Sequence, residues 1–525
     1  MSKVLKNTAV VGAMTALSRV LGLVREMFQS RLIGAGVEQS AFTLAFAIPN
    51  MMRKLFGEGA LTAAFVPVFK GEVEAQRMES ARRLARAVMT MTLLMLAAVS
   101  ALAVAGLSVA LHWGPDFSER TSLTLRLTRL LVPYMIFICG AAFGMGVLNA
   151  LGKFAAASLM PCLLNVVWIG ALGALCFFPG MPLGSRIVWV SGAILFAGFL
   201  QMAFMFWCMK RRGVSPRLSR AGWCDPNTRL VWRNMLVAAV GAGAVQINYM
   251  LDQVLAQAAA PWAAGVIGYA ERLMDLPLGI VGVAFGTVLL PTFAGHFAKE
   301  DAAGAREAFL SSTDNLLFVM IPAAVGLGIL APDITRVIYE GKAFDPAATV
   351  RVGRAVACYA LGLGFFGLQK TLVPWFQAQK DMKTPLAVSV KMVFLNATLN
   401  ILAVWLLPVE WRHVGLAAST VFCAGVACVW LAVLAHRKNG PLGLAALVRP
   451  VGRTLVASAV LGGALGASRA GLAACARTRG WSGIWANVAQ LAALVALGTV
   501  VYFAVHFLLA RRTFAARLRA LRRRR

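Results

Sequence analysis

The chain lacks the residue groupings on which most enzymes and metal proteins depend. Its nine cysteines are scattered without a Cys-x-x-Cys pair, and no histidine cluster lies beside any of them. The sequence also has no HExxH pair, no phosphate-binding glycine loop and no Ser/His/acid grouping. These absences argue against a metal site, a disulfide framework and an enzymatic role.

Charged residues are scarce. Only 14% of the 525 residues are charged and 59% are hydrophobic, which is too apolar for a soluble protein of this size. The longest polar connections, near 70–82, 210–229 and 295–308, are too short to form a folded domain. Apolar runs of roughly 20 or more residues recur, whereas the period-two alternation of a membrane barrel does not. We therefore expect an all-α polytopic membrane protein.

The apolar runs predict about fourteen transmembrane helices. The N-terminus leads into the first run without a small-residue cleavage signature, so we expect it to be retained as a helix. The predicted spans lie near 8–33, 38–69, 83–112, 121–151, 154–178, 184–209, 230–258, 262–294, 309–330, 350–377, 383–407, 412–435, 450–468 and 482–510.

Positive charge exceeds negative charge, and its distribution predicts the topology. The chain has 51 basic and 21 acidic residues, a net charge of +30. Most lysines and arginines fall in one alternate set of loops and in the C-terminal RLRALRRRR (517–525), so the positive-inside rule places both termini in the cytoplasm. This tail is most simply a topology anchor that attracts anionic lipid headgroups, and we do not expect nucleic acid as a partner.

Short matches suggest an internal repeat. FVPVF (65–69) resembles LLPTF (289–293), and LNALGKF (148–154) resembles FQAQKDM (376–382) at nearly the same offset. The matches predict two six-helix bundles, 1–225 and 226–438, followed by 439–525 with two extra helices and the basic tail. Two halves in the same orientation are an arrangement used by alternating-access transporters. The alternative is that helices ending near proline resemble one another without a repeat.

Several charged residues lie inside predicted spans, where an arginine costs a few kcal/mol. They occur in the opening helices of both halves, and their positive charges exceed the acidic ones, which predicts a cationic cavity and an anionic substrate. For each residue alone, snorkelling or a structural ion pair is the alternative. The residues are Arg19, Arg25, Arg53, Lys54, Glu58, Asp252, Glu271, Arg272 and Asp275.

At these residues the sequence resembles the MurJ/MviN family, the lipid II flippases of bacterial peptidoglycan synthesis, within the multidrug/oligosaccharidyl-lipid/polysaccharide exporter superfamily. The similarity in span pattern extends over essentially the whole chain. The motifs that carry it are SRVLGLVRE (18–26), GAG (34–36), AIPNMMRKLFGEGALTAAFVPVF (47–69), YAERLMDLPLGIVGVAFGTVLLPTF (269–293) and QKDMKTP (379–385).

The resemblance implies a fourteen-helix protein of the bacterial inner membrane. Such a protein moves lipid II, an undecaprenyl-diphosphate-linked muropeptide, from the inner to the outer leaflet. It implies substrate binding by the family's cavity arginines, with two glutamates beside them: Arg19, Arg25, Arg53, Arg272, Glu58 and Glu271. The chain departs from many relatives by having Ser40 and Ala47 where they have an acidic residue and a lysine.

Other functions are compatible with the same residues. The first is a flippase for a different polyprenyl-diphosphate-linked oligosaccharide. The second is an ion-coupled exporter of the same superfamily, although an exporter of cationic drugs should have a net acidic cavity. A scaffold for cell-wall synthesis proteins is a third, but it would not need arginines at four membrane positions.

Two further features yield predictions. Hard oxygen donors in three spans suggest a site for an alkali cation that would couple transport to Na⁺. Coupling to H⁺ or to the membrane potential is the alternative. A polar cluster whose members hydrogen-bond to one another, with Lys391 as the counter-charge to Asp252, is equally compatible with these residues. These donors are Asp252, Asn396, Asn400 and Thr420. Gly462 and Gly466 give span 450–468 a small-residue face, which predicts a groove for the polyprenyl tail beside the last two helices.

Overall fold

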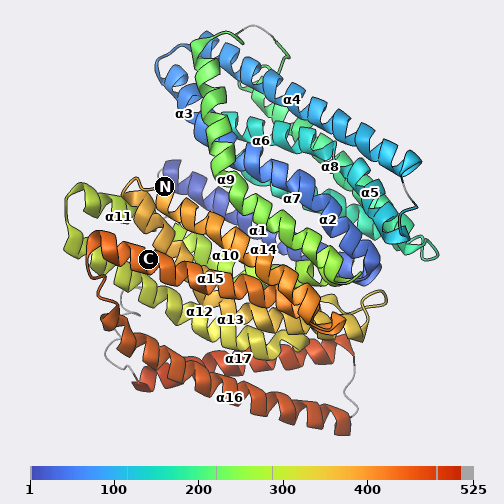
Figure 1. Ribbon diagram of the computed structural model, residues 1–525, viewed down its shortest axis with the longest axis vertical. Helices are drawn as coiled ribbons and strands as arrows, with labels where there is room; N and C mark the ends of the chain where they lie inside the picture. The colour runs from blue at the N-terminus through green and yellow to red at the C-terminus, as the bar shows by residue number, and fades with distance from the viewer. Residues whose placement is uncertain (1–2, 115, 220–221, 287, 480–482, 510–525) are drawn as a thin grey trace. The chain divides into compact units, whose positions relative to one another are not determined.

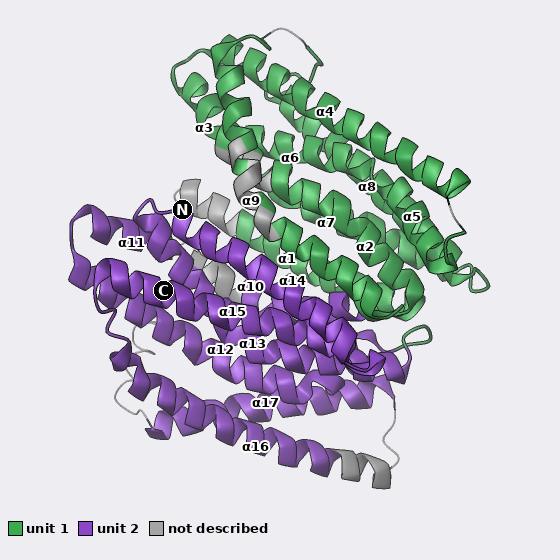
Figure 2. Ribbon diagram, viewed as in Figure 1, with its two compact units in different colours: residues 1–265, 341–344 green, residues 266–340, 345–525 purple. Residues whose placement is uncertain are grey.

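The computed structural model describes residues 3–114, 116–219, 222–286, 288–479 and 483–509 (Figure 1). Within these ranges every regular secondary-structure element is a helix, as the apolar runs predict. The chain divides into two compact units, residues 1–265 with 341–344 and residues 266–340 with 345–525 (Figure 2).

The first unit contains the helices up to α9. Their bounds are α1 (Lys3–Ile33), α2 (Val37–Met52), the π-helix η1 (Arg53–Ala60), α3 (Leu61–Glu74), α4 (Met78–Trp113), α5 (Glu119–Leu131), α6 (Tyr134–Ala150), α7 (Phe154–Leu175), α8 (Leu183–Arg211) and α9 (Pro226–Ala259). Helix α9 packs against α2, η1, α3 and α4. One apolar core of this unit surrounds Phe42, Tyr134 and Leu172, and a second surrounds Phe65, Phe143 and Met205.

The second unit contains the remaining helices. Their bounds are α10 (Ala263–Gly286), whose first turn still belongs to the first unit, α11 (Leu289–Ala298), α12 (Ala302–Tyr339), α13 (Pro346–Ala378), α14 (Lys383–Leu406), α15 (Val409–Asn439), the 3₁₀-helix η2 (Leu444–Leu447), α16 (Val448–Arg479) and α17 (Ile484–Leu509). Helix α12 packs extensively against α13, and both α16 and α17 pack against α12.

Local sequence explains where several helices begin. Asp225, Asp301 and Asp345 each accept a hydrogen bond from a backbone N–H of the first turn that follows, at 2.8, 2.8 and 2.6 Å. Capping of this kind satisfies N–H groups that have no partner within the helix. Proline follows Asp225 and Asp345 at the first helical position, where its missing N–H costs nothing.

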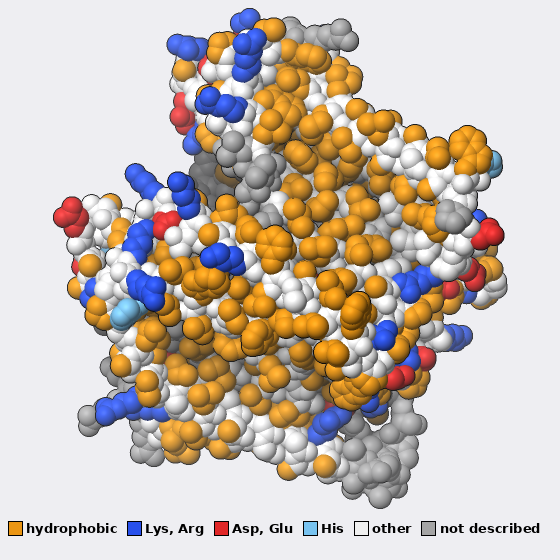
Figure 3. Space-filling view, in the orientation of Figure 1, with side chains coloured by type: hydrophobic (Ala, Val, Ile, Leu, Met, Phe, Trp, Pro, Cys, Tyr) orange, Lys and Arg blue, Asp and Glu red, His pale blue; other side chains and the backbone are white. Residues whose placement is uncertain are grey.

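Ten helical segments in the described part of the chain are long and apolar enough to cross a membrane. Apolar side chains such as Leu102 and Val429 are 74% and 64% exposed, and such side chains cover much of the surface in Figure 3. The protein is therefore a multi-pass membrane protein. The other four predicted spans, 8–33, 38–69, 230–258 and 262–294, also coincide with helices but are not among the ten. The number fourteen and the six-helix repeats stay predictions.

Candidate functional site

Arg25, in α1, is buried and held by three side chains. Its exposed fraction is 8%. The guanidinium donates from Nη1 to Oδ1 of Asn165 in α7 at 3.0 Å and from Nη2 to the carboxylate of Glu26 at 2.5 Å. Its Cζ lies 4.3 Å from the centroid of the Trp168 ring. Because an uncompensated buried charge is costly, these partners explain how α1 keeps an arginine inside a largely apolar unit.

The partners of Arg25 belong to a polar network across α1, α2 and α7. Asn165 also donates to the Ser18 carbonyl at 3.1 Å, and Trp168 donates from its indole to Oε1 of Gln29 at 3.1 Å. Gln29 in turn donates to Gln39 of α2 at 3.0 Å. Sequence reasoning missed Asn165 and Trp168. The available signal was a buried-type amide and an indole three residues apart in an otherwise apolar span.

The other predicted residues of the first unit lie in α1 and η1. Arg19 is exposed, and Arg53 is partly buried with Nε donating to Oδ1 of Asn50 at 3.1 Å. Lys54 lies with Nζ 5.2 Å from the centroid of the Tyr249 ring in α9. Arg53 is the first residue of the eight-residue π-helix, a conformation frequently found at functional sites. Glu58 belongs to the same helix, but its side chain lies outside the described residues.

Arg25 and Arg53 lie beside one apolar core. Trp168, which stacks against Arg25, belongs to this core, and Met52 and Phe56 on either side of Arg53 pack against it. Tyr134 is 1% exposed and belongs to the apolar core that also contains Trp168. The structure therefore brings Arg25 and Arg53 to the same region of the first unit.

The remaining predicted substrate-binding residues lie in α10 of the second unit. Arg272 is exposed and Glu271 is partly buried. Asp275 is exposed and lies three residues after Arg272, which places both on one side of the helix. Convergence of Arg272 with the arginines of the first unit stays a prediction.

The predicted cation-binding residues are divided between the units. Asp252, in α9 of the first unit, accepts a hydrogen bond from Asn248 at 3.2 Å. Asn396 and Asn400 are buried on α14 of the second unit, at 2% and 0% exposed. Thr420 lies on α15, which packs against α14, and donates to the Leu416 carbonyl at 3.1 Å. In the described part of the chain no group of three or more His, Cys, Asp or Glu side chains could hold a metal ion.

Lys391, Ser40 and Ala47, which had no role assigned from the sequence, each pack against neighbouring residues in the structure. Lys391 lies with Nζ 4.6 Å from the centroid of the Trp430 ring, so α14 and α15 share a cation–π contact. Ser40 is fully buried and accepts a hydrogen bond from the N–H of Gly265 at 2.9 Å. Ala47 is 2% exposed. Ser40 therefore supplies a hydrogen-bond acceptor for a buried backbone N–H, and Ala47 packs in the interior.

The two glycines of α16 differ in their surroundings. A Cβ on Gly462 would lie 3.1 Å from Val325 and 3.3 Å from Ile329 of α12, whereas a Cβ on Gly466 would meet nothing within 4 Å. The α16–α17 pair is attached to α12 by an ion pair between Arg469 and Asp333 and by a hydrogen bond from the Tyr502 hydroxyl to a carbonyl of α12. One part of the predicted small-residue face is therefore packed against α12, and another part is open.

Long apolar helices in two units, with arginines held among them, define a multi-pass helical membrane protein. The fold is similar to that of a solved lipid II flippase MurJ in an inward closed conformation (TM-score 0.77, 21% identity, 96% of this chain and 99% of that chain). It is also similar to an inward-facing multidrug resistance MATE family transporter of the MOP superfamily (TM-score 0.68, 15% identity, 83% and 98%).

Sequence comparison gives the family. The family model described as lipid II flippase MurJ matches residues 29–472. The probable lipid II flippase MurJ of Rhizobium tropici is 34% identical over 465 residues, covering 88% of this chain and 86% of the relative. The chain therefore belongs to the lipid II flippase MurJ family, and the resemblance inferred from its motifs is confirmed. Arg53 and Arg272 lie within the matched range, and Arg19 and Arg25 precede it.

Proposed function

We propose that the protein is a lipid II flippase that moves the undecaprenyl-diphosphate-linked muropeptide from the inner to the outer leaflet of the cytoplasmic membrane by alternating access. The observation that carries the proposal is the family match over residues 29–472. The buried Arg25, held by Asn165, Glu26 and Trp168, supports it, because a charge kept inside a membrane helix at this cost usually serves function.

Arg19, Arg25, Arg53 and Arg272 bind the diphosphate of the substrate. Guanidinium forks match phosphate oxygens bidentately and stay charged when partly desolvated. Arg25 contributes a guanidinium fixed in position by Asn165 and Trp168, and its ion pair with Glu26 must exchange for the diphosphate. Arg19 and Arg272 are exposed and therefore accessible to an incoming headgroup. Glu58 and Glu271 lie beside these arginines in sequence and moderate their charge.

Binding of the diphosphate changes the balance between two conformations. The binding arginines repel one another when no substrate is bound, and an anionic headgroup cancels this repulsion. Closure around the substrate is then favoured by differential affinity, as a shift in population requires. Opening on the other face releases the headgroup to the outer leaflet.

The polyprenyl tail lies in a groove beside α16 and α17, next to the open side of Gly466. Both termini face the cytoplasm, as the loop charges predict. A cation held by Asp252, Asn396, Asn400 and Thr420 couples transport to Na⁺, with H⁺ and the membrane potential as the competing energy sources. Transport that is independent of sodium, with Asp252→Asn fully active, would remove the cation site from the proposal.

The test is complementation of a bacterium depleted of its own flippase, combined with an assay of lipid II on the outer leaflet. The protein should restore growth, cell shape and lipid II translocation. Restored translocation of a different polyprenyl-diphosphate-linked oligosaccharide, without lipid II, would identify another flippase of the superfamily. Extrusion of cationic drugs alone would identify an exporter. Cell-wall synthesis proteins are the expected physiological partners, and their recovery with an inactive protein would favour a scaffold.

A further inference from the structure

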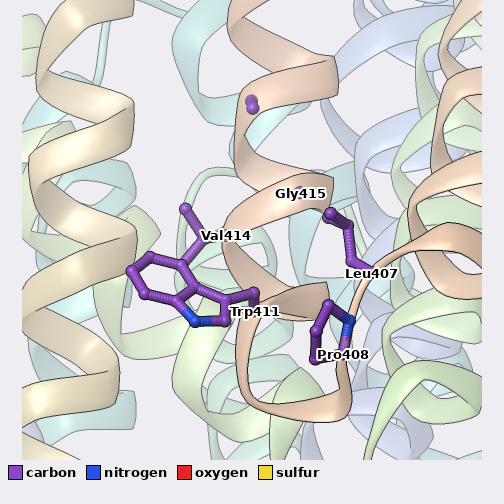
Figure 4. Close-up of a pocket in the computed structure, with 6 residues that line it drawn as sticks. Leu407, Pro408, Trp411, Val414 and Gly415 are labelled. Atoms are coloured by element: carbon purple, nitrogen blue, oxygen red, sulfur yellow. The ribbon is translucent and has the colours of Figure 1, made fainter.

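An apolar depression lies at the turn between α14 and α15. It has a volume of about 380 Å³, within the range of about 300–1,000 Å³ that is usual for ligand pockets. Figure 4 shows Trp411 and Val414 on one side of the first turns of α15, and Leu407 and Pro408 from the preceding turn on the other. The residues that line it are Leu407, Pro408, Trp411, Val414, Gly415 and Ala418.

The depression lies at a membrane–water interface. Both α14 and α15 are long and apolar enough to cross a membrane, so the short turn between them marks the end of two spans. Trp405, Leu406 and Trp411 are 81%, 76% and 46% exposed around this turn. Exposed tryptophans are typical of the headgroup level of a bilayer. The open side of the depression therefore faces lipid.

Two arginines border the depression, each in contact with a residue that lines it. Arg354 of α13 lies with Cζ 4.6 Å from the centroid of the Trp411 ring. Arg412 donates from Nε to the carbonyl of Leu407 at 3.1 Å. Stacking on Trp411 engages the face of the Arg354 guanidinium, whereas a phosphate is bound by the N–H groups at its edge. Glu410 is exposed on the same turn, so the three side chains together carry one net positive charge.

We propose that this depression is a binding site for an anionic phospholipid. One acyl chain lies in the apolar trough between Leu407 and Ala418, and the phosphate contacts the guanidinium groups of Arg354 and Arg412. The site is separate from the diphosphate-binding arginines of the proposed function. It requires neither Arg19, Arg25, Arg53 nor Arg272, and it concerns a resident lipid rather than the transported one.

The charge of the headgroup decides the selectivity of this site. Lipid tails in the surrounding bilayer are as apolar as the trough, so an acyl chain gains little by exchanging one for the other. An arginine near the membrane surface contributes about 1 kcal/mol toward an anionic headgroup, which corresponds to about a fivefold preference. Guanidinium groups also bind phosphate oxygens in a defined geometry. The trough fixes the position of the lipid, and the arginines select it.

The experiment uses the purified full-length protein and native mass spectrometry with phosphatidylglycerol or phosphatidylcholine added at equal concentrations. We expect the wild-type protein to retain one phosphatidylglycerol molecule preferentially. Arg354→Gln should weaken its retention about fivefold, and Arg354→Gln with Arg412→Gln more strongly. The matched control is Arg217→Gln, which removes an exposed arginine from the loop between α8 and α9, distant in sequence from Arg354 and Arg412. It should leave retention of the lipid unchanged.

A second variant tests the trough. Ala418→Trp fills it without removing charge and should abolish retention of the lipid, whereas Ala98→Trp on the exposed surface of α4 should not. Folding of each variant is followed by its thermal unfolding in detergent. Equal retention of both lipids by the wild type, or phosphatidylglycerol retention that survives Ala418→Trp and the double arginine variant, would show only unselective annular lipid and overturn the proposal. Displacement of the lipid by a second copy of the chain in the same spectra would also overturn it.

Discussion

The guanidinium of Arg25 and the indole of Trp168 lie against each other, with Cζ of the arginine 4.3 Å from the ring centroid. The two residues are in different helices, α1 and α7, which pack along one another in the first unit. A desolvated contact of this kind stabilises by up to about 2 kcal/mol. It holds the arginine in place together with the hydrogen bond from Nη1 to Asn165.

Asn165→Leu should impair both stability and transport. The change removes a buried acceptor of Arg25 and leaves the arginine with fewer partners, which should cost about 1–3 kcal/mol. Asn165→Asp retains the acceptor and should keep Arg25 in place. Thermal unfolding in detergent and the outer-leaflet lipid II assay measure the two effects.

The matched control is Val166→Leu, at a 55% exposed position one residue further along α7. It should behave like the wild type. Equal stability and transport for the wild type, Asn165→Leu and Trp168→Leu would mean that Arg25 does not need these partners.

Hydropathy predicted the helical class and the approximate extent of the helices, because length and apolarity are properties of single segments. It did not predict how individual spans are interrupted. The predicted span 121–151 is divided into α5 and α6 before Tyr134, where Pro133 interrupts the helix, and span 38–69 contains the π-helix Arg53–Ala60. Such local changes depend on backbone hydrogen bonding that hydropathy does not describe.

The candidate site was predictable in part. Arg25 stood out because a charge in an apolar run is costly. Its partners Asn165 and Trp168 did not, since their contact depends on how α1 packs against α7 and not on spacing along either helix. For the same reason the sequence pattern placed Gly462 and Gly466 on one small-residue face, although only Gly462 packs against α12.

The two glycines of α16 offer a separate test of the tail groove. Gly462→Leu should destabilise the protein, because its side chain would collide with Val325 and Ile329. Overpacking of this kind typically costs about 1–3 kcal/mol. Gly466→Leu has room for its side chain, so it should leave thermal unfolding unchanged while lowering lipid II translocation. Full translocation by a well-folded Gly466→Leu protein would argue against a tail groove at this face.

The loop between α13 and α14 should show a pH-dependent contribution to stability. The Asp381 carboxylate accepts hydrogen bonds from Lys438 at 2.7 Å and from the Thr384 backbone at 3.0 Å, which lower its pKa to about 2. A depressed pKa contributes stability that is present above the unfolded value of 3.8 and is lost as the pH falls toward about 2.

The expected result is a decrease in the unfolding temperature of the wild type between about pH 4 and pH 2. Asp381→Asn should be less stable than the wild type at pH 7 and should lack this part of the decrease. Glu300→Gln, in the exposed loop before α12, is the control and should follow the wild type. Parallel curves for the wild type and Asp381→Asn would contradict the assignment.

The arginines themselves provide the most direct test of substrate binding. Arg19, Arg53 and Arg272 should each tolerate lysine poorly, because lysine keeps the charge and loses the two parallel N–H donors that match a diphosphate. We expect lipid II translocation to fall about tenfold in each Arg→Lys variant, equivalent to about 1.4 kcal/mol. Each Arg→Ala variant should show no measurable translocation while the protein stays in the membrane at wild-type amounts. Arg217→Lys and Arg217→Ala, at the exposed loop position, should translocate normally. If the alanine variants of Arg19, Arg53 and Arg272 all supported normal growth as the cell's sole flippase, the diphosphate would have to be bound elsewhere.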